Sequence, residues 1–153
     1  MASDNEKAVR PHEVLMFNLA VCHFLLPAIL FGTKQLWLIF TIPVLCSLVF
    51  IGWIARQAGR TDHSSHLVKA HWQLTWTRSQ FLILAYFVAV VIFLLGSFLI
   101  DRQPDEAMQF IQRSILGWFA LLPLSVTIIV LLIFEASAMS QARKGIMPAD
   151  MKL

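Results

Sequence analysis

The sequence predicts an all-α protein, a bundle of four transmembrane helices arranged as two antiparallel helical hairpins. Of the 153 residues, 58% are hydrophobic and only 14% are charged. Soluble domains contain about 45–50% apolar and about 25% charged residues. The apolar residues also gather in four blocks, each close to the length of about 20 residues that a helix needs to cross a bilayer. We therefore expect residues 1–153 to form a single transmembrane domain.

The first two apolar blocks, residues 14–31 and 36–54, are separated by a short polar turn. A connection this short is typical of antiparallel helices that pack side by side. Asn18, His23 and Pro27 interrupt the first block. This block is longer than the apolar stretch of a secretory signal, and no small-residue cleavage site closes it, so we expect a retained helix.

The other two apolar blocks, residues 81–100 and 111–134, are separated by an acidic turn and predict a second hairpin. Residues 135–144 continue the helical pattern of the last block. Gly145 follows them, and glycine is favoured just beyond a helix end. In lipid every backbone N–H and C=O needs an internal partner, which leaves only helices or a closed barrel. The blocks lack the alternating polarity of barrel strands, so helices are predicted.

Residues 55–80 are the longest polar stretch and are expected to form a cytoplasmic loop, in which Asp62 or Ser64 caps a short helix. Basic residues are enriched on the cytoplasmic side of membrane proteins. Most of the 12 Lys and Arg residues lie in this loop or outside the two hairpins, namely Lys7, Arg10, Arg56, Arg60, Lys69, Arg78, Arg143, Lys144 and Lys152. This distribution predicts a bacterial inner (plasma) membrane protein with both termini in the cytoplasm, and it explains the net charge of +3 without a nucleic-acid partner.

His23 is the candidate cofactor ligand within an apolar block. A neutral imidazole in a membrane can ligate haem iron or relay protons. A haem held by two histidines needs a second histidine at a similar depth, and the other apolar blocks contain none. We therefore predict no bound cofactor and expect His23 to form an interhelical hydrogen bond.

His63, His66 and His71 are a second group of candidate ligands. On a helix, His63 and His66 would share a face, and Asp62 could complete a site for Zn²⁺ or another transition metal. No cysteine accompanies them in the sequence. We expect solvated loop histidines and no metal.

Trp72, Trp76 and Arg78 precede the third apolar block and are predicted interaction residues. Indole rings prefer the headgroup level of a membrane, and basic side chains meet anionic phosphates there. The segment is therefore expected to contact lipid or a partner protein. Glu135, at the inner end of the fourth block, is the fourth interaction residue; we expect it to meet water or to pair with Arg56 or Arg78.

The stretch from Ser65 to Trp76, which reads SHLVKAHWQLTW, and the basic tail Arg143-Lys144-Gly145 resemble features of a group of small bacterial membrane proteins. Those proteins carry a Ser-His pair near a Gln, and a Thr-aromatic pair just before an apolar helix. They are related to the membrane component of the chloroplast Tic translocon. The resemblance covers the second half of the chain. It implies a multi-pass membrane protein of unknown function, and it supplies no catalytic residues.

The sequence contains no Gly-rich phosphate loop, no His-Glu-x-x-His motif and no paired-cysteine motif. We therefore predict a non-enzymatic accessory or scaffold subunit of a larger inner-membrane complex, whose partners are the lipid bilayer and either other membrane subunits or further copies of the chain. Two alternatives stay open. One is a redox subunit that binds haem or metal through His23 or the second histidine group. The other is a small homo-oligomeric transporter lined by Asn18, His23, Thr41, Ser47, Ser125 and Thr127.

Overall fold

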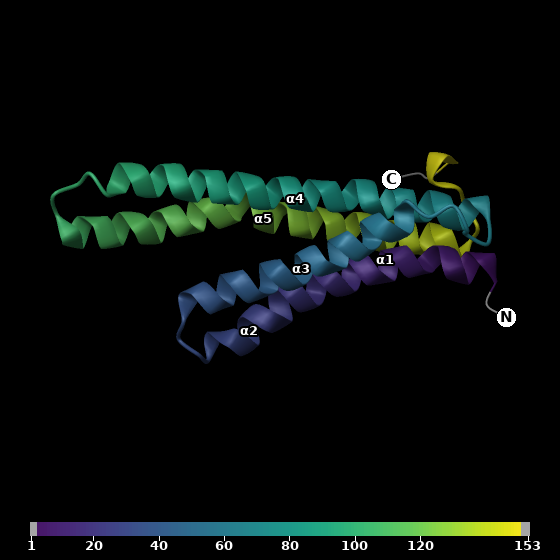
Figure 1. Cartoon of the computed structure of the whole chain (residues 1–153), viewed down its shortest axis with the longest axis horizontal. Helices are drawn as coiled ribbons and strands as arrows, with labels where there is room; N and C mark the ends of the chain where they lie inside the picture. Colours follow the sequence, from purple (N-terminus) through teal and green to yellow (C-terminus); the bar gives the residue numbers. More distant parts are fainter. Residues whose placement is uncertain (1–2, 151–153) are drawn as a thin grey trace. The chain divides into compact units, whose positions relative to one another are not determined.

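The computed structural model describes residues 3–150, and within that range it is a bundle of long helices without strands. Four helical segments are long and apolar enough to cross a membrane. The predicted all-α fold is therefore confirmed (Figure 1). In chain order the elements are α1 (Asp4–Ala20), the π-helix η1 (Val21–Leu25), α2 (Leu26–Phe31), α3 (Leu36–Ala58), α4 (His66–Ile100), α5 (Glu106–Arg143) and the 3₁₀ helix η2 (Pro148–Asp150).

Helix α1 begins at Asp4, ten residues before the first apolar block. A reciprocal cap fixes this start, since the Ser3 hydroxyl accepts from the Glu6 N–H at 3.3 Å and the Glu6 carboxylate accepts from the Ser3 N–H at 2.8 Å. Such a capping box satisfies two of the N–H groups that a helix start leaves unpaired. The helix therefore extends outside the apolar block through a polar turn that carries its own N-cap.

The first span contains a wide π turn at η1, just before Pro27. The N–H of Leu26 donates to the carbonyl of Val21, five residues earlier, in place of the usual four. Proline has no N–H to donate, and its ring needs space beside the carbonyl four residues back. The widened turn provides that space, as π-bulges commonly do in helices.

The predicted loop over residues 55–80 is wrong in extent, because only residues 59–65 lie outside the helices. Helix α3 continues to Ala58, and α4 begins at His66, fifteen residues before the third apolar block. The reason is that the first turns of α4 have a buried face that is not a stripe of apolar residues, so it cannot be recognised in the sequence. The first turns of α4 bury one face, but polar side chains make up much of that face, which comprises Val68, His71, Trp72, Thr75, Arg78 and Ser79.

Helix α5 confirms the predicted extension beyond the fourth apolar block. It ends at Arg143, and Gly145 follows with φ of +72°, a backbone conformation that glycine adopts at no steric cost. The N–H of Ile146 then donates to the carbonyl of Gln141 at 3.2 Å. This six-to-one bond is the helix-ending pattern that a glycine cap permits.

The chain divides into two compact units, and the division falls inside α4 and α5 rather than in a linker. The described part of unit 1 comprises residues 3–79 and 131–150, and unit 2 comprises residues 80–130. In unit 1, α1 and α3 form the first predicted hairpin (Figure 1). Unit 2 is the hairpin made by the last turns of α4 and the first turns of α5, where Gly96 packs directly against Leu116.

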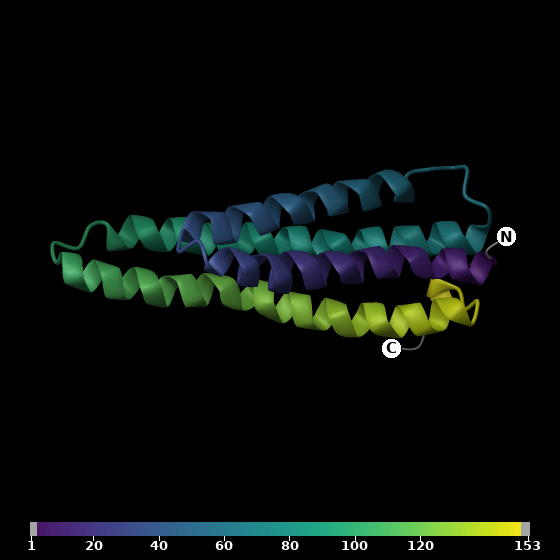
Figure 2. The same ribbon diagram turned by 90° about the horizontal axis from the view of Figure 1, so that it is seen from below.

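The start of α1 and the end of α5 lie at the same end of unit 1 (Figure 2). The side-chain amide of Asn5 donates to the carbonyl of Arg143 at 3.3 Å. The hydroxyl of Ser64, in the segment between α3 and α4, donates to Asp4 at 3.1 Å. We call this region, where residues 3–13, 59–72 and 140–146 meet, the polar end of unit 1.

Candidate functional site

Four ionisable side chains meet in the interior of unit 1, and we call them the buried cluster. They are His12 from α1, His71 and Arg78 from α4, and Glu135 from α5. His12, His71 and Glu135 have no exposed surface, and Arg78 retains only 8%. Charged groups are almost never buried unless they are paired, because removing an ion from water is costly. Burying the cluster therefore costs free energy, which the pairing of its members must offset.

The two carboxylate oxygens of Glu135 are held by two different helices. Arg78 Nη1 donates to Oε1 at 2.9 Å and also to the carbonyl of Phe134 at 2.9 Å. His12 Nδ1 lies 2.6 Å from Oε2. The guanidinium also lies 5.6 Å from the centre of the Phe134 ring, within the range of a cation–π contact. Glu135 thus links α1, α4 and α5 through charge-assisted hydrogen bonds.

The hydrogen-bonded chain continues beyond His12 to the C-terminal tail. His12 Nε2 lies 2.8 Å from His71 Nδ1, with the two rings nearly perpendicular. His71 Nε2 then donates to the carbonyl of Ile146 at 3.0 Å. The hydroxyl of Thr75 lies 3.3 Å from His12 Nδ1. The cluster therefore fixes the first residues after α5 as well as three helices.

The number of protons in this hydrogen-bonded series determines the net charge of the buried cluster. Glu135, His12, His71 and the Ile146 carbonyl are joined by three hydrogen bonds, and each bond needs one proton. A carboxylate and two neutral imidazoles supply only two, because a neutral imidazole carries one N–H. Without a third proton, two lone pairs would face each other between His12 and His71. The geometry therefore requires one further proton, so that the buried cluster, with Arg78, carries one net positive charge.

The cluster lies where three of the predicted apolar blocks end. His12 comes two residues before the first block, Arg78 three residues before the third, and Glu135 directly after the fourth. Their side chains contact one another, so these three block ends are brought to a common level in the fold. Polar residues at the ends of membrane spans stay near the interface, where partial hydration and pairing lower their cost.

For Glu135 the sequence left two alternatives open, contact with water or a pair with Arg56 or Arg78. The structure has the pair with Arg78, at 2.9 Å. The Glu135 side chain has no exposed surface, so the water alternative is not the one adopted. Helix α1 covers the carboxylate, and the position of a residue at the end of its own helix does not reveal that a different helix packs over it.

The three histidines of the second candidate group do not gather. His63 lies before α4, where its Nε2 is 2.8 Å from the carbonyl of Gln57 and its ring stacks on Trp72. His66 is the first residue of α4 and is exposed. His71 belongs to the buried cluster, so its prediction as a solvated loop histidine is wrong. Among residues 3–150, no group of three His, Cys, Asp or Glu side chains is arranged to hold a metal.

His12 is the cluster residue that the sequence interpretation missed. It stands just before the first apolar block, in a polar segment for which the sequence predicts no role in the bundle. Its signal is a stripe among the buried positions on α1, formed by Ala8, His12, Leu15 and Leu19. These recur at intervals of four, three and four, the pattern of one buried helix face. Following that stripe outward past the apolar block would have identified His12.

His23 and Asn18 lie outside the buried cluster, within the widened part of the first span. The His23 ring is half-buried and lies near the backbone of Asn18 and Leu19. Asn18 is fully buried, and both of its side-chain polar atoms are without a hydrogen-bond partner among the described residues. A buried unsatisfied amide costs about 1–3 kcal/mol, so Asn18 is a point of local instability.

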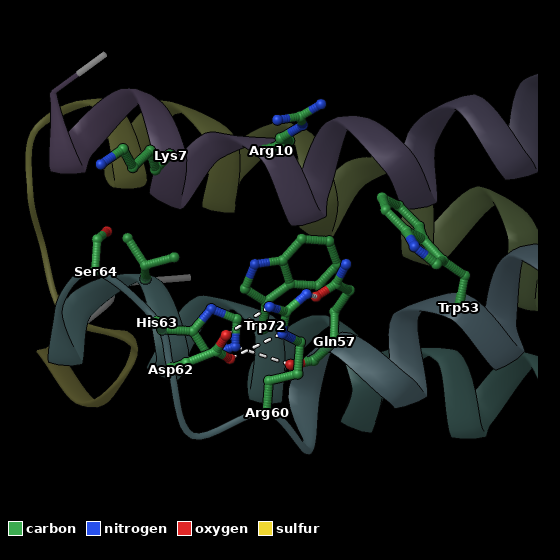
Figure 3. A pocket seen from close by; sticks show the side chains of 10 residues that line it. Lys7, Arg10, Trp53, Gln57, Arg60, Asp62, His63, Ser64 and Trp72 are labelled. Carbon is green, nitrogen blue, oxygen red and sulfur yellow. Dashed lines mark hydrogen bonds and ion pairs between the residues drawn. The ribbon is translucent and has the colours of Figure 1, made fainter. Parts of the chain in front are cut away.

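A cleft of about 370 Å³ lies at the polar end of unit 1, and we call it the basic cleft. Figure 3 shows Lys7 and Arg10 on α1, with the Arg60–Asp62 pair near the rings of His63 and Trp72. Trp72 is 5% exposed and packs edge-to-face on Trp53 at 5.5 Å. Little of its surface is therefore left outside the cleft, whereas Trp76 is half-buried. The remaining lining residues are Gln57, Ser64 and Val68.

Arg60 and Asp62 form a two-point ion pair at the rim of the basic cleft. Arg60 Nε and Nη2 donate to the two Asp62 oxygens at 2.8 and 2.5 Å. These hydrogen bonds hold the pKa of Asp62 at about 2, below its ordinary value. The pair thus remains ionised throughout the physiological pH range, and the charge of Arg60 is neutralised.

Comparison of the chain with protein-family models, with curated proteins and with solved structures found no match in any of the three. The resemblance to the Tic-related membrane proteins therefore stays a prediction. The buried cluster and the basic cleft are interpreted from their own chemistry.

Proposed function

We propose that this chain is a non-enzymatic integral membrane protein that serves as an accessory or scaffold subunit of a larger inner-membrane assembly. The observation that carries the proposal is the large uncovered apolar surface of its helices. Of the 18 most apolar consecutive residues of α4, only 11% are buried within the chain. In unit 2, the side chains of Phe87 and Trp118 are 65% and 79% exposed. Lipid covers such a surface, and so do the helices of a partner.

The buried cluster supports a structural rather than a catalytic role. Each carboxylate oxygen of Glu135 has a charged or imidazole donor, and His71 is held between His12 and a backbone carbonyl. A general acid or base must reach the proton it transfers on a substrate, directly or through one water. These groups face each other in the protein interior, where they stabilise the arrangement of α1, α4 and α5.

The transporter alternative receives no comparable support from the polar residues of unit 2. Ser125 and Thr127 donate to carbonyls of their own helix, at Leu121 and Pro123. This intrahelical bond is the usual way in which a membrane helix satisfies a hydroxyl. The two hydroxyls are therefore explained without a polar pathway.

Site-specific crosslinking tests the subunit proposal. A photoreactive amino acid is placed at Trp118 or Phe87, and the chain is irradiated in its native membrane before mild-detergent purification and mass spectrometry. We expect one defined protein adduct from each exposed position. The matched control is Leu82, which is fully buried and should give no intermolecular adduct. A chain that purifies as a lone monomer and crosslinks only to lipid would overturn the proposal.

A further inference from the structure

The basic cleft carries an excess of positive charge that the chain does not neutralise. Lys7 and Arg10 are three residues apart on α1, so both lie on one face of the helix. Lys7 has a weak pairing with Asp4 at 3.7 Å, with both side chains almost half exposed. Arg10 is exposed, and within residues 3–150 it has no ion-pair partner. Because Asp62 neutralises Arg60, two cations remain among the lining side chains.

The other walls of the cleft are typical of a site at a membrane surface. The indoles of Trp53 and Trp72 form an aromatic wall, and Trp53 is 39% exposed. Gln57 adds a side-chain amide to the lining, whereas the Ser64 hydroxyl already donates to Asp4. A guanidinium and an ammonium next to an amide donor suit a phosphate group, which accepts several hydrogen bonds through its oxygens.

The depth of the cleft also matches the headgroup layer. Arg10 and Lys7 precede the first apolar block by four and seven residues. At 1.5 Å per residue, they lie about 6 and about 10 Å outside the hydrocarbon core if α1 runs along the membrane normal. The headgroup regions extend ~5–8 Å beyond the core on each side, so the Arg10 backbone lies within this layer and the Lys7 backbone lies just beyond it. Indole rings prefer the same layer.

From these three observations we infer that the basic cleft binds an anionic phosphate group through Lys7 and Arg10, either on a phospholipid headgroup or as a free phosphate. The inference does not depend on the proposed subunit role, because a protein of any function can hold such a ligand.

Native mass spectrometry of the full chain in detergent tests the inference with dioleoyl phosphatidylglycerol, dioleoyl phosphatidylcholine and inorganic phosphate as probes. We expect Arg10→Gln and Lys7→Gln each to weaken binding of the anionic lipid about fivefold, the effect of losing one basic residue near an anionic surface. The control is Lys144→Gln, which removes an exposed cation outside the cleft lining. It should leave binding unchanged, and circular dichroism should show equal helicity in all variants.

The two sources of phosphate are distinguished by competition. Displacement of phosphatidylglycerol by millimolar inorganic phosphate would assign the site to a free phosphate, and retention of the lipid would assign it to a headgroup. Equal binding of phosphatidylglycerol and phosphatidylcholine, with no phosphate effect, would overturn the inference. An equal loss in the Lys144→Gln control would also overturn it, because it would show general charge attraction in place of a site.

Discussion

Glu135 has no contact with water, and its charge is balanced by side chains from two other helices. Removing one member of a buried ion pair costs about 3–5 kcal/mol, because the remaining charge is left without compensation. We expect Glu135→Ala to lower the free energy of unfolding by about this amount, since the buried Arg78 guanidinium would lose its carboxylate partner. Unfolding by denaturing detergent, followed by circular dichroism, measures the change.

The matched control for this prediction is Glu13→Gln, an exposed carboxylate on α1 next to His12. It should change stability by less than about 0.5 kcal/mol, as is usual for surface substitutions. A Glu135→Ala variant as stable as this control would show that the buried cluster does not hold the helices together.

The proton count of the buried cluster leads to a second prediction for the same residues. With three hydrogen bonds and two neutral imidazoles, one proton must be added and shared between Glu135, His12 and His71. We expect ¹⁵N NMR of histidine-labelled protein at neutral pH to show one signal from His12 or His71 with both ring nitrogens protonated. Glu135→Gln should abolish that signal, since the amide offers no negative charge to balance the proton.

The exposed His66 serves as the internal reference for the NMR assignment. Two neutral imidazole patterns for His12 and His71, together with an ionised Glu135 carboxylate in the ¹³C spectrum, would contradict the proton count, because the three hydrogen bonds would then share only two protons.

At the residue scale the sequence allowed only part of the cluster to be predicted. The Glu135–Arg78 pair could be proposed because both residues flank apolar blocks that end on the same side. The roles of His12 and His71 depend on a contact between residues 59 positions apart, which no local pattern contains. Histidine in a polar stretch is typical of solvated loops, and only the packing of α1 against α4 makes His71 a buried group.

At the element scale each apolar block corresponds to one of the four candidate membrane spans within residues 3–150, but the blocks did not locate the helix ends. The blocks record where the lipid environment requires apolar side chains, and a helix continues into water without that requirement. Helix α4 has 35 residues, which at 1.5 Å per residue make about 52 Å, well beyond a hydrocarbon core of about 30 Å. Its first turns are held by the polar contacts of unit 1.

The packing of unit 2 rests on a close approach at Gly96. A Cβ atom added there would lie 2.3 Å from Leu116 Cδ1, closer than van der Waals contact allows. We expect Gly96→Val to destabilise the chain by about 1–3 kcal/mol, the usual cost of overpacking. Adding Leu116→Ala should restore part of this loss, because it removes the atoms that clash. Detergent-induced unfolding of the two single variants and the double variant measures the coupling.

The control for the Gly96 experiment is Gly117→Val, where an added Cβ meets nothing within 4 Å. If the Gly96 and Leu116 substitutions add independently, the close contact does not contribute to the stability of unit 2.

At the scale of the whole molecule, the number of spans and the distribution of basic residues determine the expected orientation. Within residues 3–150, four helices are long and apolar enough to span a membrane, and four crossings would return the chain to the side on which it started. The contact of Asn5 with Arg143 agrees with this, because it joins the beginning of α1 to the end of α5. Lys and Arg are retained on the cytoplasmic side, so the polar end of unit 1 should face the cytoplasm.

Cysteine labelling with a membrane-impermeant maleimide tests this orientation. Cys22 and Cys46 are first replaced by alanine, and a single cysteine is introduced at Gln103, in the turn between α4 and α5, or at Thr61, in the segment between α3 and α4. Both positions are exposed, so differences in labelling report the side of the membrane and not burial. We expect Gln103→Cys to be labelled in intact bacterial cells and Thr61→Cys only after the inner membrane is permeabilised. The reverse pattern would place the basic cleft outside the cytoplasm and show that the charge distribution does not set the topology of this chain.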